Sequence, residues 1–205
     1  MAPLITRLAN MSSSAGVLPS SLKQGRVTPL LNMSGLDQFD MANYRPITNL
    51  STMSKILEKL AMHRLRPHVM STGRFSECQS AYRLGHSTET ALLKVVSDVV
   101  TSACDRQTTV LLSLDISAAF DSIDHDILLE RLGTDFGNSG SAHGWLRSFV
   151  TGRMQYVAVG TERLPPANCT SGVPQGNVLG PLLFAMYISP MSSVVAAHGL
   201  CYSIH

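Results

Sequence analysis

The segment LLSLDISAAFDSIDHDILL, residues 111–129, constrains this chain more than any other part of the sequence. It begins within TTVLLSLDI, residues 108–116, a β-rich apolar run that predicts a strand buried on both faces. The run delivers Asp115 to the end of that strand, and Phe120 and Asp121 follow shortly after. A carboxylate at the end of a buried strand costs free energy unless something compensates its charge. Any fold of this chain must therefore supply a partner for Asp115.

Two kinds of partner would satisfy Asp115. A strand-end aspartate can cap the turn or helix that follows by accepting backbone hydrogen bonds. Alternatively, the carboxylate can bind Mg²⁺, which proteins usually hold with one or two carboxylates while substrate phosphates complete the shell. A strand that carries Asp115 to its rim would then form half of a metal clamp for phosphoryl transfer. The local residues alone leave both interpretations open.

Composition favours a folded chain with uneven charge. Hydrophobic residues make up 44% of the 205 residues and charged residues 15%, which supports a sizeable core. Residues 1–100 hold eleven Lys and Arg against six Asp and Glu, whereas residues 101–205 hold five against eight. A basic first half beside an acidic second half suits a polyanion-facing lobe joined to a cation-binding lobe, although chance variation explains it equally well.

The remaining pattern mixes helices and strands. From Ser51 the apolar residues Met53, Ile56, Leu57, Leu60 and Ala61 recur at helical steps, and Pro67 is predicted to end that helix. A second helix is predicted at 88–103, with an apolar stripe formed by Leu92, Val95, Val96, Val99 and Val100. Shorter helices are predicted at 4–11, 125–132, 141–152 and 181–188, and strands at 26–31 and 154–160. This order predicts an α+β fold with a helix-backed sheet.

Cysteine, histidine and hydropathy patterns exclude several classes of protein. Four cysteines at 78, 104, 169 and 201 show neither zinc nor disulfide spacing, which predicts reduced thiols in an intracellular protein of the cytoplasm or nucleus. The seven histidines show no metal-binding spacing. Residues 178–197 are long enough to cross a bilayer, but Gly180, Pro181 and Pro190 interrupt them. No positive charge follows to orient a span, so we expect a buried core element and no membrane partner.

Four segments of the chain resemble motifs of one family. LLSLDISAAFDSIDH resembles motif A of reverse transcriptases, in the version found in non-LTR (LINE-type) retrotransposons. SGVPQGNVLGPLLF resembles their motif B, NYRPITNLSTMSKILEKL their fingers motif 2, and QSAYRLGHSTETALL their insertion-type motif 2a. The four occur in the order of the family and span about residues 20–200. The resemblance implies the fingers and partial palm of a right-hand polymerase, with the thumb absent.

The resemblance implies roles for three residues of motif A. Asp115 matches the first catalytic aspartate of the family, a ligand of both Mg²⁺ ions, and the carbonyl of Ile116 is expected to contact one of them. Phe120 falls on the steric gate, where a bulky ring excludes a ribose 2′-hydroxyl. A core aromatic beside the strand is the alternative for Phe120. Asp121 and Asp124 are expected to hold the turn, and Asp126 to lie in the first turn of a helix.

Motif B and the fingers imply further contacts. Gln175 and Gly176 match the Pro-Gln-Gly core of motif B and are expected to contact the nucleotide or template, whereas an ordinary turn before a helix is the alternative. Arg45 is a candidate for gripping the triphosphate, and Lys55 is a weaker candidate. Arg83 could contact template or backbone phosphates. Asn177 stands where relatives carry Ser or Thr, and it can still cap the following helix.

The paired aspartate of motif C is expected directly after AAHGL, but the sequence there reads CYSIH. We therefore expect a truncated reverse transcriptase: residues 1–40 leading into the fingers, 41–108 as the fingers and 109–205 as the partial palm. The resemblance implies an RNA template, a DNA primer, a dNTP and Mg²⁺ as partners. Polymerase activity of the chain alone is expected to be nil or nearly so, because a two-metal site needs more carboxylates. A non-catalytic nucleic-acid-binding remnant and a non-functional product are the alternatives.

Overall fold

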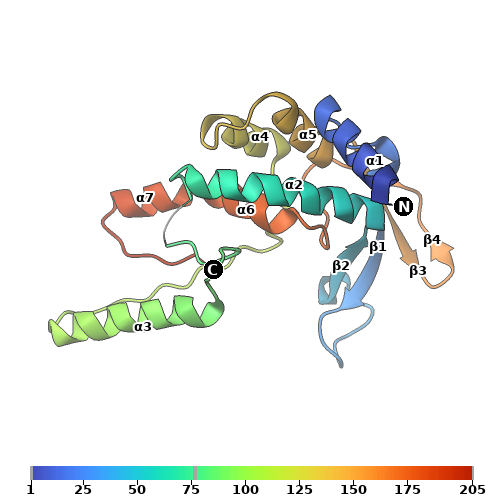
Figure 1. Cartoon of the computed structure of the whole chain (residues 1–205). Coiled ribbons are helices and arrows are strands. Elements are labelled where there is room, and N and C mark those ends of the chain that lie inside the picture. Colours follow the sequence, from blue (N-terminus) through green and yellow to red (C-terminus); the bar gives the residue numbers. More distant parts are fainter. Residues whose placement is uncertain (1, 76–77, 205) are drawn as a thin grey trace.

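The computed structural model describes residues 2–75 and 78–204 and shows a cluster of helices with a small mixed sheet extending from one end of it, so the sheet is not backed by helices as the sequence predicts (Figure 1). The sheet has the order β2-β1-β3-β4, and β5 pairs with β3. β1 runs antiparallel to β2 and parallel to β3, while β4 and β5 run antiparallel to β3. The strands are β1 (Gln24–Leu31), β2 (Tyr44–Asn49), β3 (Arg153–Val159), β4 (Glu162–Arg163) and β5 (Ala167–Cys169).

The helices carry most of the core. They are α1 (Ala2–Ala15), α2 (Thr52–Ser71), α3 (Thr88–Cys104), α4 (His125–Thr134), α5 (Gly140–Val150), α6 (Gly180–Ile188) and α7 (Met191–Ala197), with short 3₁₀ turns at Ser20–Leu22 and Met41–Asn43. Their fully buried side chains, such as Leu128, Phe149 and Leu183, form one cluster. α6 belongs to this core, whereas α7 has no buried residue, so the buried element expected over 178–197 is found in its first half only. Gly180–Ala197 is long and apolar enough to span a bilayer, but one such stretch is weak evidence for a membrane.

α2 is longer than its sequence predicts. Pro67 does not end the helix, which continues to Ser71. Proline removes one backbone hydrogen bond from a helix, but Leu65 and Val69 are buried on either side of it. Packing of this last turn against the core offsets the lost bond. The buried face also differs from the predicted one, because Ser54 and Glu58 are buried whereas Leu60 is 45% exposed.

The predicted strand over 108–116 is wrong. The structure gives these residues no regular secondary structure, and Val110, Leu111, Leu112 and Leu114 are all more than two-thirds exposed. A strand needs a neighbour to satisfy its backbone N–H and C=O groups. Among residues 2–75 and 78–204, other strands form the sheet, and none of them pairs with this segment. Its apolar residues therefore remain without the cover that a buried strand requires.

α3 is the other element with little cover. It forms over almost the predicted range, and its N-terminus is closed by a capping box between Ser87 and Thr90. Only Ala91 is buried, while Leu92, Val96 and Val100 are each more than half exposed. Figure 1 shows α3 extending away from the rest of the molecule. The predicted apolar stripe thus exists, but it faces solvent.

The pairing of β3 with β5 predicts the relative reactivity of the cysteines. Cys169 lies opposite Arg153 in this pairing and is partly buried. Burial raises the pKa of the Cys169 thiol, although the neighbouring Arg153 partly opposes that rise. A higher pKa leaves less thiolate at a given pH. We expect Cys169 to be alkylated by iodoacetamide at pH 8 more slowly than the exposed Cys104 and Cys201, as peptide mass spectrometry would measure. Equal rates would contradict the β3–β5 pairing.

Candidate active-site junction

Two segments that are far apart in the sequence join by backbone hydrogen bonds. Val173 N–H donates to the Phe120 carbonyl over 2.9 Å, and Gly172 N–H donates to the Ile123 carbonyl over 2.7 Å. The turn at 117–123 reaches this position because Ala118 adopts a left-handed backbone conformation with φ 51°. The loop at 171–177 precedes α6. These hydrogen bonds bring the turn that follows Asp115 against the Pro-Gln-Gly segment.

The end of β2 joins the same place. Thr48 N–H donates to the Gln175 carbonyl over 2.8 Å. Gly176 has φ 108°, and a Cβ placed there would lie 2.9 Å from the Thr48 carbonyl oxygen. Only glycine allows both this conformation and this close approach. We call residues 117–123, 171–177 and Thr48 the junction.

One side-chain hydrogen bond ties the two loops together at the surface. The Gln175 side-chain amide donates to Asp121 Oδ2 over 3.1 Å, and Ser171 Oγ donates to the Asp121 carbonyl over 3.3 Å. Asp121 thereby holds the turn, as its sequence position predicts. Asp124 caps α4 by accepting from Ile127 N–H over 2.9 Å. Asp124 was expected to hold the turn with Asp121, and the structure places it at the end of the turn as the N-cap of α4.

Phe120 sits between the core and the surface. Its side chain is half-buried, and its ring lies 5.7 Å from that of Phe184 on α6, with the ring planes at 54°. Tilted aromatic pairs at this distance are favourable. The residue is partly buried and partly exposed, so its position suits both the core role and the gate role weighed from the sequence.

Asp115 lies on the exposed, irregular segment rather than at the rim of a strand. Ile116 is also exposed, at 45%. The Asp115 carboxylate forms no hydrogen bond or ion pair with any residue that the structure describes. Within the same residues, no group of three His, Cys, Asp or Glu side chains could hold a metal ion. Asp115 therefore offers an accessible oxygen ligand, but the described residues do not complete a metal site around it.

The two candidate phosphate ligands come from different elements. Arg45 is exposed on β2, on the opposite face from Thr48, because successive strand residues alternate between faces. Lys55 is partly buried in the first turn of α2. Neither side chain has a hydrogen bond or salt bridge with residues 2–75 or 78–204. Arg83 lies in the turn before α3 and is partly buried.

Sequence reasoning missed Glu58, a fully buried carboxylate on α2. Its Oε1 accepts from Ser54 Oγ over 2.9 Å, and its Oε2 accepts from Val178 N–H over 2.7 Å. Val178 directly follows the junction, so Glu58 ties α2 to the Pro-Gln-Gly loop. The i, i+4 spacing of Ser54 and Glu58 was the available signal, but both residues fell outside the predicted apolar face.

Arg153, at the start of β3, is the other buried charge. It is 1% exposed, donates from Nε to the Phe149 carbonyl over 2.6 Å and stacks 4.5 Å from the centre of the Phe149 ring. Burial lowers the pKa of the Arg153 guanidinium, and the negative charge of Glu58 opposes that change. The negative charge of Glu58 thus favours the charged form of Arg153 inside the core.

The comparisons with known proteins identify the family. Residues 33–204 match the family model of the reverse transcriptase (RNA-dependent DNA polymerase). The chain is 32% identical over 191 residues to a probable RNA-directed DNA polymerase from transposon X-element of Drosophila melanogaster. It is 29% identical over 182 residues to the RNA-directed DNA polymerase from mobile element jockey of the same species. The chain belongs to the reverse transcriptase family, and these relatives come from retroelements, as the four motifs predict.

A solved structure confirms the predicted fold. Apo telomerase from Candida tropicalis, truncated from the C-terminal domain, matches 89% of this chain and 41% of its own chain, with a TM-score of 0.53 and 13% sequence identity. The curated relatives are much longer than this chain. The alignment with the X-element polymerase covers 91% of this chain and 20% of that polymerase. The alignment with the jockey polymerase covers 89% of this chain and 20% of that polymerase. The chain thus corresponds to about a fifth of each relative.

The close packing at the junction predicts that replacing Gly172 by a residue with a side chain lowers the free energy of unfolding more than usual. A Cβ there would lie 2.8 Å from Asp121 Cα, at a φ of 75°. Gly160 is a matched control, because it has φ 59° but nothing within 4 Å of the added Cβ. We expect Gly160→Ala to cost about 1 kcal/mol through backbone strain alone. Gly172→Ala should cost at least about 2 kcal/mol more, because it also disrupts close backbone packing. Urea unfolding measures both, and equal costs would contradict the junction.

Glu58 gives a second prediction. Glu58→Ala removes the acceptor for Val178 N–H and for Ser54 Oγ, so we expect a loss of about 1–3 kcal/mol in unfolding free energy. Glu58→Gln retains an acceptor and should lose less. Glu89→Gln, at an exposed acid on α3, is the control and should change stability by less than about 0.5 kcal/mol. Equal stability of Glu58→Ala and the control in urea unfolding would refute the buried link.

Proposed function

We propose that this chain supplies the fingers and part of the palm of an RNA-directed DNA polymerase of a retroelement, with residues 41–108 as the fingers and 109–205 as the partial palm. Residues 1–40 lead into the fingers. The RNA template, the DNA primer and the incoming dNTP are its proposed partners. The observation that carries this proposal is the junction, which gathers Phe120, Gln175 and Gly176 from two distant motifs at one partly exposed place.

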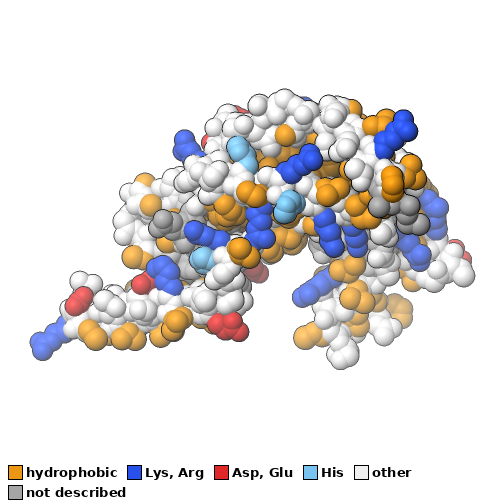
Figure 2. Space-filling model, viewed as in Figure 1, with side chains coloured by type: hydrophobic (Ala, Val, Ile, Leu, Met, Phe, Trp, Pro, Cys, Tyr) orange, Lys and Arg blue, Asp and Glu red, His pale blue; other side chains and the backbone are white. Residues whose placement is uncertain are grey.

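A basic helix face supports the contact with nucleic acid. Lys55, Lys59, His63 and Arg66 recur on one side of α2, at the spacing of 3.6 residues per turn. The sole acid of α2 is Glu58, and it is buried, so the exposed side of this helix carries no negative charge. Figure 2 shows Lys, Arg and His side chains along a hollow below α2, between the β1–β2 end and α3. Positive charge clustered along the edge of a hollow attracts a phosphate backbone.

Each candidate residue has a task in this arrangement. The Phe120 ring, supported from behind by Phe184, would lie under the sugar of the incoming nucleotide and exclude a 2′-hydroxyl. Arg45 would grip the triphosphate with its planar guanidinium, and Lys55 would add a point charge. Gln175 and Gly176 would contact the nucleotide or the template, with Asp121 holding the Gln175 amide in place.

Asp115 and the Ile116 carbonyl would contribute oxygen ligands to Mg²⁺. Mg²⁺ would supply charge stabilisation for the attack of a primer 3′-hydroxyl on the dNTP. The described residues offer no cluster of three ligating side chains, so we derive no step through the metal. We expect the remaining ligands to come from outside the described residues.

Nucleic-acid binding without catalysis is the second candidate function. The basic face of α2 needs no metal, and the exposed Asp115 lacks companion ligands among the described residues. Under this proposal the chain binds an RNA or RNA–DNA duplex through phosphate contacts but incorporates no nucleotide.

A binding experiment tests the basic face. We expect the 205-residue chain to bind a fluorescent RNA–DNA primer-template with an affinity that falls as salt rises, measured by fluorescence anisotropy. Lys59→Gln should weaken binding and reduce the log–log salt slope by about one. Arg7→Gln on α1, equally exposed but outside this face, is the control. A change in the control as large as in Lys59→Gln would argue against the proposed site.

A primer-extension experiment separates the two candidate functions. The wild-type chain alone, with Mg²⁺, dNTPs and the same primer-template, is expected to extend the primer no more than Asp115→Asn does. Extension well above that variant would establish catalysis and contradict the incomplete metal site. Absence of both binding and extension would leave neither function supported.

A further inference from the structure

Residues 107–114 form an uncharged, strand-like stretch that is open to solvent. The sequence QTTVLLSL holds no Asp, Glu, Lys, Arg, Gly or Pro, and half of its residues are Val or Leu. Short segments of high β-propensity and low charge, without Pro, are the ones that pair between chains. We call residues 107–114 the uncharged segment. Its four large apolar side chains are between 70% and 88% exposed: Val110, Leu111, Leu112 and Leu114.

The backbone of this segment is as open as its side chains. No N–H or C=O group of residues 108–116 forms a hydrogen bond with another residue in 2–75 or 78–204. Arg106, just before it, has φ 56°, and its N–H donates to the Ala103 carbonyl over 3.0 Å, so the chain turns at the end of α3. Unpaired main-chain groups in a β-rich sequence fit one kind of partner, which is another strand.

α3 adds a second apolar surface close to this segment in the chain. Two residues separate its end at Cys104 from the uncharged segment, and Figure 1 shows the chain returning from there towards the junction. Figure 2 shows hydrophobic side chains along the edge of α3 that faces away from the rest of the molecule. The exposed stripe of α3 consists of four side chains that are 54–70% exposed: Leu92, Leu93, Val96 and Val100.

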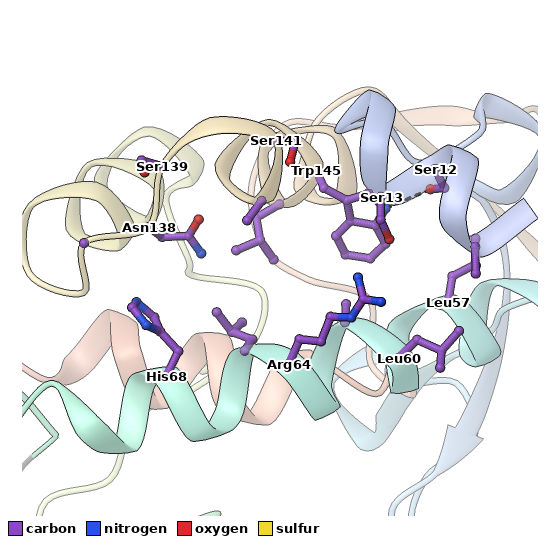
Figure 3. Close-up of a pocket in the computed structure, with 16 residues that line it drawn as sticks. Ser12, Ser13, Leu57, Leu60, Arg64, His68, Asn138, Ser139, Ser141 and Trp145 are labelled. Carbon is purple, nitrogen blue, oxygen red and sulfur yellow. Dashed lines mark hydrogen bonds between the residues drawn. The ribbon is translucent and has the colours of Figure 1, made fainter. Parts of the chain in front are cut away.

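The helix cluster does not cover these side chains. Figure 3 shows Leu57, Leu60 and Trp145 around a hollow between α1, α2 and α5, and no residue that lines this hollow belongs to α3 or to the uncharged segment. At on the order of 100 Å² each, the exposed Val and Leu side chains of α3 and the uncharged segment amount to roughly 800 Å², the area that one partner contributes to a standard interface.

The charges around this surface favour a second copy of the chain over nucleic acid. Lys94, the sole cation of α3, is held by Asp98 in a salt bridge of 2.8 Å, and the uncharged segment has no Lys or Arg. A phosphate backbone is bound mainly through such cations. A second copy brings an identical unpaired strand and an identical apolar stripe, and a two-fold axis lets one contact satisfy both copies.

Asp115 determines the direction of pairing, because it directly follows the uncharged segment. Parallel pairing in register would place the two Asp115 carboxylates opposite each other, and like charges directly opposite are destabilising. Antiparallel pairing centred near Leu111 moves the two carboxylates to opposite ends of the paired strands. An isolated two-stranded ribbon is only marginally stable, so its apolar side chains also need cover from a helix.

We propose that the uncharged segments of two copies of this chain pair as antiparallel strands, and that the exposed stripe of each α3 packs against the ribbon that they form. The dimer does not rest on the polymerase function, because neither the junction nor the basic face of α2 takes part in it.

Sedimentation velocity of the full chain without nucleic acid tests the proposal. We expect the mass to rise reversibly from that of one chain to that of two as the protein concentration increases through the micromolar range, since association follows mass action. The absence of nucleic acid separates this result from the outcome of the binding experiment on the basic face.

Leu111→Pro tests the strand pairing. Proline has no N–H to donate, and residue 111 is irregular and exposed, so the variant should keep the stability of the monomer but weaken association at least about tenfold. Leu84→Pro is the matched control, because Leu84 is 84% exposed and lies in a turn closed by His86 N–H and the Arg83 carbonyl. Gly85 has φ 78°, the turn geometry that favours proline at the preceding residue, so association should not change.

Two further variants test the cover from α3 and the direction of the strands. Val96→Asp places a charge in the middle of the exposed stripe and should weaken association by about 3–10-fold. Asp115→Asn should change the association constant by less than about twofold, because antiparallel pairing keeps the two carboxylates apart.

Several results would overturn the proposal. They are a monomer at every concentration, equal association of Leu111→Pro and Leu84→Pro, no effect of Val96→Asp, and markedly tighter association of Asp115→Asn. Urea unfolding checks that each variant is folded. If Leu111→Pro does not fold, Leu112→Lys takes its place, since it puts a charge into the uncharged segment without altering the backbone and should weaken association to a similar degree.

Discussion

The buried carboxylate of Glu58 is the interaction on which the rest of the arrangement depends. It joins α2 to the loop before α6 through Val178 N–H, and its negative charge acts on the buried Arg153 at the start of β3. The carboxylate of Glu58, which is buried from water, therefore lies where α2, the loop before α6 and the start of β3 come together. Since a carboxylate in the interior is tolerated only with such partners, its position specifies how these elements pack.

The junction extends this link to the surface. Backbone hydrogen bonds from Val173 and Thr48 hold the two motif segments together, and glycines at 172 and 176 permit backbone contacts that any side chain would block. The nucleotide site proposed at the junction would need rigid support and an open face. Here the support comes from buried hydrogen bonds, while Asp121, Gln175 and part of Phe120 remain accessible.

Sequence reasoning predicted the helical elements better than the apolar strand. The starts of α3 and α4 follow local signals, the capping box at Ser87 and the Asp124 cap, because a few neighbouring residues determine them. The helix boundary at Pro67 was wrong because burial of Val69 outweighs a local preference. Residues 108–116 have strand composition, but a strand also requires a partner elsewhere in the chain, and local composition contains no information on that partner.

The sequence by itself determined the family, since four motifs in order identify a reverse transcriptase, and it named the candidate site residues. Only the tertiary structure decided which of those residues meet. It brought Phe120, Asp121 and Gln175 together, left Asp115 on an exposed segment, and buried Glu58 against Val178. The physical reason is that motif residues are recognised by type and spacing, whereas contacts between segments some fifty or more residues apart depend on how the whole core packs.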